Sequence, residues 1–235
     1  MGAQPHENGS TRPPSARKTG CEGEDPRAKV RCMTVVLDVA ADGDQPALCL
    51  RPWLLADMPD LLAATADEYP SQGLGSHLDL SHLFQQRWSG PRNAEEAGLW
   101  LSGQERGWEH GDWLTFAVTD VSQDKAVGHV GLWNRDGGQV GSGDQGEIGY
   151  WTAADSRGRG IAPAAVRAVT GWAFDNFGPG GLPRIMLVHD LDNPASCRVA
   201  AKSGYPFQRL SPANPPHWFT DGHIHVAEPP ARGHL

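Results

Sequence analysis

A glycine-rich turn between a strand-like segment and a helix-like segment constrains the fold of this 235-residue chain more than any other feature. Residues 147–152 are mainly aromatic and β-branched, which is typical of a strand. Residues 161–177 carry apolar side chains at helical spacing, among them Val166 and Phe177. Because Gly158 and Gly160 lie just before that helix, the backbone there is free to turn sharply and to approach a ligand closely.

The start of this predicted helix is a candidate anion site. The first amides of a helix have no partner within it, and they lie at the positive end of its dipole. Arg157 and Arg159 add full charges beside them, and Pro163 falls in the first turn, where no amide is needed. The residues therefore predict a cradle for a phosphate or pyrophosphate and leave the cofactor open.

Three known phosphate-binding turns have sequence patterns of their own. The chain contains no GxxxxGK[ST] run, which excludes a Walker loop. The dinucleotide fingerprint needs Gly or Ala where Pro163 stands, and the early βαβ start is absent. A third pattern, [QR]-x-x-G-x-[GA], is met by Arg157, Gly160 and Ala162.

The rest of the chain alternates strand-like and helix-like segments, which predicts one α/β (α+β) domain with a partly antiparallel sheet. Strands are expected at residues 33–39, 48–53, 114–119, 126–133, 147–152, 184–188, 205–210 and 223–226. Helices are expected at residues 56–68, 93–105, 161–177 and 194–202, and residues 70–92 are expected to be loop-rich.

The two ends differ in composition from this domain. Residues 1–32 hold six basic and four acidic side chains among Pro, Gly and Ser, and few apolar ones. Such a segment buries too little surface to offset the entropy of ordering, so it is expected to be a disordered tail. A single domain over residues 33–228 and a flexible end over residues 229–235 are expected to follow.

Charge and cysteine content exclude several classes of protein. The net charge is −8, and because residues 1–32 carry +2, the remainder carries −10. A sequence-blind nucleic-acid binder needs a basic surface, so this balance argues against one. No apolar stretch approaches the roughly 20 residues of a membrane span, and no signal peptide is evident. The four cysteines show no CxxC or His/Cys cluster, and His217, His223 and His225 lack the spacing of metal ligands, so no metal site is expected.

The cradle and two flanking motifs resemble the GNAT superfamily of acyl-CoA N-acyltransferases. Upstream lies Glu-Ile-Gly-Tyr-Trp at 147–151, and downstream lies the run Asp-Asn-Pro-Ala-Ser-Cys-Arg-Val-Ala-Ala-Lys-Ser-Gly-Tyr at 192–205. That second run is similar to the branch that includes the ribosomal-protein serine and alanine N-acetyltransferases. The resemblance covers about residues 46–228 and is strongest over residues 147–205.

This resemblance implies a GNAT-like mixed, largely antiparallel, splayed sheet flanked by helices, with acetyl-CoA as co-substrate in the gap. It implies that backbone groups of Trp151 and Thr152 pair with the pantetheine arm. It also implies that Asn193 binds the pantetheine amides and that Ser196 lies near the sulfur. The expected pyrophosphate ligands are the Arg157 side chain and the turn residues Gly158, Arg159, Gly160, Ile161 and Ala162.

The candidate catalytic residues are Glu147 and Ser196. An attacking ammonium must lose a proton, and Glu147 is the first candidate base, with His129 the second. Ser196 is the candidate proton donor to the thiolate, because the position where many family members have a tyrosine is Ala200 here. Each has a structural alternative: a paired strand carboxylate, a packing histidine, and a helix-surface serine. Asn193 equally suits the cap of the helix that begins at Pro194.

The expected function is acetyl transfer from acetyl-CoA to a primary amine on a small molecule or a protein N-terminus. The negative domain favours a cationic acceptor. Two alternatives stay open: a non-catalytic acyl-CoA-binding module, and transfer of a bulkier acyl group such as succinyl. Trp88 and Trp133 are the aromatic residues expected beside the acceptor. The protein is expected to be cytoplasmic, without a nucleic-acid or membrane partner, and a homodimer is common in this family.

Overall fold

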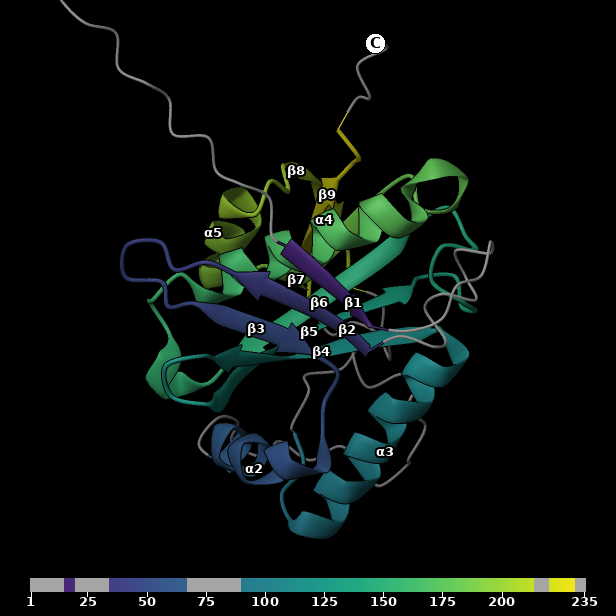
Figure 1. Cartoon of the computed structure of the whole chain (residues 1–235). Helices are drawn as coiled ribbons and strands as arrows, with labels where there is room; N and C mark the ends of the chain where they lie inside the picture. Colours follow the sequence, from purple (N-terminus) through teal and green to yellow (C-terminus); the bar gives the residue numbers. More distant parts are fainter. Residues whose placement is uncertain (1–14, 20–33, 67–89, 214–219, 231–235) are drawn as a thin grey trace, which may run out of the picture.

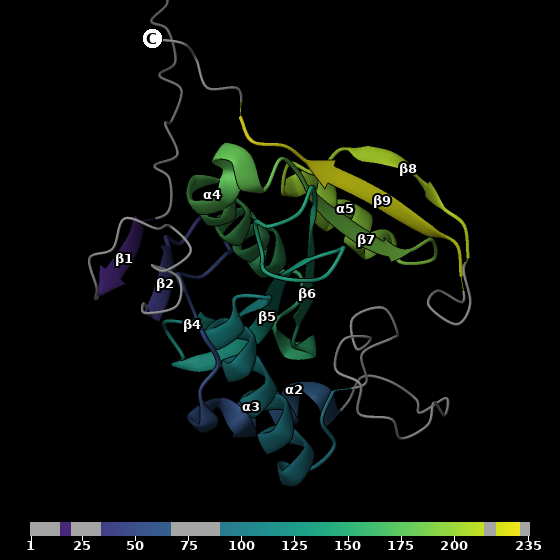
Figure 2. The ribbon, with the colours of Figure 1, turned by 90° about the vertical axis from the view of Figure 1, so that its right-hand side faces the viewer.

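The computed structural model describes residues 15–19, 34–66, 90–213 and 220–230. Within them, nine strands form one sheet in the order β1-β2-β3-β4-β5-β6-β7-β9-β8 (Figures 1 and 2). The strands are β1 Ser15–Thr19, β2 Thr34–Val39, β3 Leu48–Arg51, β4 Trp113–Asp120, β5 Lys125–Asn134, β6 Gly146–Thr152, β7 Ile185–Asp190, β8 Phe207–Ser211 and β9 Gly222–Ala227. The helices are α2 Met58–Ala66, α3 Ala94–His110, α4 Ile161–Gly181 and α5 Pro194–Lys202, with short 3-10 turns η1 Leu55–Asp57 and η3 Ala154–Ser156.

The predicted elements are found with shifts of a few residues at their ends. Helix α5 has the predicted bounds, and Asn93 caps α3 by accepting a hydrogen bond of 2.9 Å from the Glu96 amide. Helix α3 continues to His110, past the predicted end, because Gly111 supplies the left-handed C-cap. The predicted loop at residues 70–92 lies largely outside the described residues, as does the acceptor candidate Trp88.

The predicted disordered tail is wrong for residues 15–19. They form β1, which pairs antiparallel with β2 from Ser15↔Asp38 to Thr19↔Thr34. Strand pairing uses main-chain amides and carbonyls, so a segment poor in apolar side chains is still able to extend a sheet edge. Apolar burial, the basis of the predicted tail, does not include this ladder of main-chain hydrogen bonds.

The sheet is antiparallel except where β6 and β7 run parallel, and that pair is short. Only Gly146↔Ile185 and Glu147↔Met186 are in register, whereas β6 continues to Thr152 and β7 to Asp190. Beyond Glu147 the two strands therefore part. This mixed, largely antiparallel and splayed sheet confirms the predicted fold class.

Helices cover both faces of the sheet, α2 and α3 on one face and α4 and α5 on the other (Figure 1). The main core lies between α4 and the strands, where side chains two apart along a strand share a face. Its fully buried members include Leu50, Leu114, Phe116, Val130, Leu132, Ile148, Val166 and Val169.

A smaller core lies under α2 and α3. It gathers Trp53, Leu61, Ala97, Trp100 and Leu101 with Ala117 of β4, and Trp151 of β6 packs against it. Because Tyr150 packs against the main core and Trp151 against this one, consecutive residues of β6 face opposite layers. None of the helices in the described residues combines the length and the apolar character that crossing a bilayer requires.

Candidate active site

The glycine-rich turn opens α4, as the sequence predicts. Gly158 and Gly160 have φ angles of 78° and 77°, in the left-handed region that side chains with a Cβ rarely adopt. Gly160 is the N-cap of α4, and no side chain caps the helix there. Across the described part of the chain, no acceptor is found for the main-chain amides of residues 158–162. The turn thus presents a row of amide donors at the positive end of a 21-residue helix.

The two arginines of the turn have different surroundings. The exposed Arg157 donates from Nε to the carbonyl oxygen of Thr152, over 3.1 Å. Arg159 donates to Oδ2 of the buried Asp120, over 3.1 Å. Burial disfavours the charge of Asp120, but hydrogen bonds from Ser122 and Arg159 outweigh it and lower its pKa. Arg159 is therefore held at the end of β4, and the carboxylate of Asp120 offsets part of the positive charge of Arg159.

Trp151 and Thr152 lie at the end of β6, past the point where β7 departs. On their other side they pair with His129 and Gly128 of β5. The Trp151 ring is stacked on the His129 ring, with centroids 6.0 Å apart and planes 7° apart. The side chain of Trp151 thus packs against the core under α2 and α3. The main-chain edge of β6 at these two residues faces the split, where β7 no longer pairs with it.

Asn193 caps α5. Its Oδ1 accepts a hydrogen bond of 3.2 Å from the Ser196 amide, and Pro194 follows at the first helical position. This contact is the structural alternative that the sequence left open. It orients the first turn of α5, which carries Ser196.

Ser196 is buried, and Oγ accepts a hydrogen bond of 2.9 Å from the hydroxyl of Tyr150. Burial raises the pKa of Tyr150 to about 12, with the nearby Cys197 adding to the rise and the Ser196 hydrogen bond opposing it. Tyr150 thus stays protonated and remains a donor. Because Oγ accepts the hydrogen bond from Tyr150, the hydroxyl hydrogen of Ser196 is left to donate to another group.

Glu147 is 4% exposed and forms an ion pair with Arg135, which follows β5. Burial raises the pKa of Glu147, and the charge and hydrogen bond of Arg135 oppose that rise. Glu147 lies two and four positions before Gly149 and Trp151, so it belongs to the strand face that looks toward α2 and α3. The raised pKa keeps Glu147 a candidate base. Its pairing with Arg135 is at the same time the structural alternative that the sequence left open.

His129 is enclosed by aromatic rings. The indole Nε1 of Trp53 donates to His129 Nδ1 over 3.0 Å, and the rings of Trp100 and Trp151 lie within 6.0 Å of it. Burial lowers its pKa to about 3. These are the contacts of a packing histidine, which the sequence held as the alternative to a base.

Two further aromatic residues of this region are buried. Tyr205, after the glycine of the downstream motif, is fully buried and bonds Thr170 through its hydroxyl. Trp133 is 8% exposed and stacked on Trp113, with centroids 4.9 Å apart, so the ring expected beside the acceptor is mostly covered.

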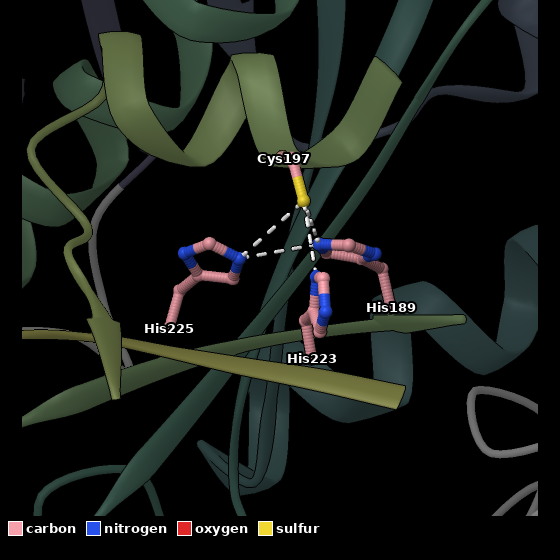
Figure 3. Close-up of side chains that lie close together, drawn as sticks. All are labelled: His189, Cys197, His223 and His225. Atoms are coloured by element: carbon pink, nitrogen blue, oxygen red, sulfur yellow. Dashed lines mark hydrogen bonds between the residues drawn. The ribbon is translucent and has the colours of Figure 1, made fainter. Parts of the chain in front are cut away.

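The sequence shows no His/Cys cluster, but the fold brings one together. His189, Cys197, His223 and His225 place one potential ligand atom each within 4.8 Å of one another (Figure 3). The cysteine and the histidines are far apart in the sequence, and folding joins them. A signal was present in His223 and His225, because two histidines two apart on a strand share a face.

Sequence reasoning also missed Tyr150 and Asp120 as parts of this region. Tyr150 stands in the quoted upstream motif, and its alternation with Trp151 was a signal that it faces the other layer. Asp120 stands 39 residues before Arg159, and no spacing rule links them.

Comparisons with known proteins agree with this geometry. A family model described as the acetyltransferase (GNAT) domain matches residues 47–206. No curated protein sequence matches the chain. The solved structure of Mycobacterium smegmatis RimJ in complex with CoA-disulfide is 20% identical, with a TM-score of 0.63, over 82% of this chain and 86% of that one.

Two further solved structures have the same fold. A putative ribosomal-protein-serine acetyltransferase from Vibrio cholerae is 17% identical, with a TM-score of 0.60, over 82% of this chain and 97% of that one. The Microcin C7 self immunity acetyltransferase MccE, in complex with acetyl-CoA and AMP, is 15% identical, with a TM-score of 0.60, over 77% and 92%. At these identities the likeness shows a shared fold.

Proposed function

The chain belongs to the GNAT acetyltransferase family, and from that premise we propose that it transfers the acetyl group of acetyl-CoA to a primary amine by direct attack. The observation that carries the proposal is the parting of β6 from β7 beside the amide row of the glycine-rich turn. A strand edge that the neighbouring strand no longer accompanies suits an extended amide-bearing arm, and the start of α4 suits a pyrophosphate. Coenzyme A has both parts in one molecule.

The proposed cofactor contacts follow from the order of these elements. The main chain of Trp151 and Thr152 pairs with the pantetheine arm, as an added strand would. The amides of Gly158, Arg159, Gly160, Ile161 and Ala162 bind the pyrophosphate. Arg157 is exposed at the edge of this row and supplies the full charge, whereas Arg159 is held by Asp120 and positions the turn. Asn193 caps α5 and thereby orients the first turn of this helix beside the pantetheine arm.

The leaving thiolate needs a proton. In this proposal it takes the hydroxyl proton of Ser196, which a proton from solvent replaces. Attack of the amine on the thioester carbon gives a tetrahedral oxyanion, which collapses with loss of the thiolate. Tyr150 holds Ser196 Oγ from the strand side, so that the serine proton is directed away from the tyrosine. Tyr150 acts as a positioning residue, and its raised pKa keeps it a donor throughout.

The amine reaches the thioester from the other side of β6. Glu147 shares the face of β6 that carries Trp151, whereas Tyr150 faces the layer of α4 and α5. Base and acid are thereby separated by the strand, as direct transfer between two substrates requires. In this proposal Glu147 accepts the ammonium proton, and Arg135 opposes the rise that burial causes in its pKa.

The acceptor is proposed as a primary amine with a positive charge. The net charge of −10 over residues 33–235 attracts cations to the domain. Among the relatives in fold, the Vibrio cholerae protein is a putative ribosomal-protein-serine acetyltransferase, and MccE is a microcin self immunity acetyltransferase. A protein N-terminus and an amine-bearing small molecule are both within the proposed class.

Calorimetric titration of the purified chain with acetyl-CoA, succinyl-CoA and NAD tests the first part of the proposal. Micromolar binding of acetyl-CoA and none of NAD is expected, and binding of neither thioester would remove the cofactor assignment. Thiol release is then measured with and without a panel of cationic amines and basic peptides. Release that depends on the amine supports the transferase, whereas binding without release would make the chain an acyl-CoA-binding module. A preference for succinyl-CoA in both assays would instead replace acetyl by the bulkier group.

A further inference from the structure

Three histidines and one cysteine meet where α5 crosses β7 and β9. His189 lies on β7, His223 and His225 lie on β9, and Cys197 lies on α5 (Figure 3). In the β7–β9 ladder His189 is opposite His223, and His225 is two positions further along the same face. Cys197 points from the helix into the space between the three imidazoles (Figure 3). Three elements thus contribute ligand-type atoms to one point.

Two of these imidazoles have their tautomers set by carbonyl oxygens. His189 Nδ1 lies 2.8 Å from the Asp190 carbonyl, and His225 Nδ1 lies 3.1 Å from the Tyr205 carbonyl. A carbonyl only accepts, so both Nδ1 atoms carry the proton and both Nε2 atoms present a lone pair. Metal-binding histidines commonly donate their other ring N–H to a backbone carbonyl in this way.

The two lone pairs face each other. His189 Nε2 and His225 Nε2 are 3.2 Å apart, and with both neutral no hydrogen is available to join them. A metal cation between the two nitrogens satisfies both lone pairs at once.

The spacings fit a tetrahedral zinc ion. Bonds of about 2.05 Å to nitrogen and about 2.3 Å to sulfur give tetrahedral edges of roughly 3.3 Å between nitrogens and roughly 3.6 Å from sulfur to nitrogen. Cys197 Sγ lies 3.4 Å from His189 Nε2, 3.1 Å from His223 Nδ1 and 3.9 Å from His225 Nε2. These edges scatter around the tetrahedral values, and all four ligand atoms lie within 4.8 Å of one another, which is the spacing of a metal site.

We propose that His189, Cys197, His223 and His225 bind one Zn²⁺ ion with a Cys-His₃ ligand set. One thiolate with three imidazoles is a borderline-soft donor set, which suits zinc better than magnesium or calcium. Four protein ligands fill the tetrahedron, so the ion is structural and leaves no position for a substrate. Cys197 binds it as the thiolate, and its proton leaves to solvent.

The ion would fasten α5 to the strands beneath it. The same helix carries Ser196 one residue before Cys197, and Ser196 contacts Tyr150. The zinc site therefore fixes the helix turn on which the proposed acid lies. The metal proposal itself does not depend on acetyl transfer, because it rests on the four side chains alone.

Metal content tests the proposal directly. The full-length chain is purified without an affinity tag that binds metal, and its zinc is counted by plasma mass spectrometry before and after reconstitution. One zinc per chain is expected in the wild type, with loss in Cys197→Ser and in His223→Asn. Removing a ligand should weaken zinc binding by more than the roughly 10- to 100-fold that loss of an outer-shell partner costs. Cys49→Ser and His110→Asn are matched controls outside the cluster and should retain the metal.

Cobalt substitution reports the ligand set without any assay of activity. Co²⁺ in the wild type should give the visible bands of a tetrahedral site and a near-ultraviolet thiolate-to-cobalt band, which Cys197→Ser removes. A chelator should lower the melting temperature of the wild type and leave that of Cys197→Ser unchanged, because bound metal stabilises the folded state by mass action. Absence of stoichiometric metal after reconstitution, with no cobalt bands in a folded wild type, would overturn the proposal. Zinc retained fully by both ligand variants would also overturn it.

Discussion

The hydroxyl of Tyr150 donates a hydrogen bond of 2.9 Å to Oγ of Ser196, and the two residues lie 46 positions apart in the chain. Tyr150 belongs to the part of β6 that β7 no longer accompanies, and Ser196 belongs to the first turn of α5. The hydrogen bond therefore connects the strand with the helix across the split in the sheet. It places a neutral donor behind the serine that we propose as the proton donor to the thiolate.

Replacing Tyr150 by Phe should lower kcat about 10-fold and leave the Kd for acetyl-CoA nearly unchanged. The change removes the donor to Ser196 and keeps the ring in the core. Ser196→Ala removes the proposed acid and should cost more, about 100-fold or above. Steady-state thiol release and calorimetry separate the two effects.

Tyr205→Phe is the matched control for this series, because it removes a buried tyrosine hydroxyl that bonds Thr170 instead. It should lower the melting temperature with little effect on kcat. A Tyr150→Phe variant that loses stability but keeps its kcat would assign the hydroxyl to structure alone.

Arg157→Glu should weaken acetyl-CoA binding by about 2–3 kcal/mol, or roughly 30- to 150-fold in Kd. The substitution places a negative charge against the pyrophosphate at the edge of the amide row. Arg106→Glu makes the same change of charge on an exposed position of α3, on the other side of the sheet, and should bind acetyl-CoA normally. Equal affinities in the two variants, measured by calorimetry, would contradict the cradle.

The pH dependence of turnover should report Glu147. Burial raises the pKa of this carboxyl against the opposing charge of Arg135. A base acts when ionised, so wild-type turnover should rise with pH through that raised pKa, at a higher pH than for an ordinary glutamate. Glu147→Gln should lose this rise and about 100-fold in turnover near neutral pH.

Activity of Glu147→Gln should recover at high pH, where solvent deprotonates the amine. Acetyl-CoA affinity should stay as in the wild type, as should the whole profile of Glu109→Gln, an exposed carboxylate on α3. Wild-type turnover in Glu147→Gln would take this residue out of the mechanism.

Asp120→Asn should destabilise the fold by about 1–3 kcal/mol in urea unfolding at neutral pH. Burial works against the charged form, but hydrogen bonds from Ser122 and Arg159 prevail and keep the pKa of Asp120 low. A lowered carboxyl pKa gives stability that is present above the ordinary value of 3.8 and is lost as the pH falls below it. The difference between wild type and variant should therefore shrink in acid.

Asp124→Asn is the control for this change. It alters an exposed carboxylate in the same turn, at a positive φ of 49° that asparagine tolerates. Equal unfolding midpoints for Asp120→Asn and the wild type would show that the Arg159 contact contributes nothing measurable.

The parts of the site that lie close together in the sequence were predictable from it. The glycine-rich turn, the helix that follows and the cap at Asn193 depend on neighbouring residues, and the structure has each of them at the predicted place. The strand β1 was not predicted, because its order comes from main-chain pairing with β2 and not from apolar side chains. The Arg159–Asp120 and Tyr150–Ser196 pairs were missed, because each joins elements that only the folded sheet brings together.

By itself the sequence determined the local features: the periodicities that set strands and helices, the glycines at positive φ and the amide row of α4. Those depend on interactions within a few residues. The tertiary structure alone decided which face each side chain of β6 meets and that Cys197 joins His189, His223 and His225. Sheet order and register decided these contacts, because antiparallel pairing of β7 with β9 and packing of α5 over them set distances between residues far apart in the chain.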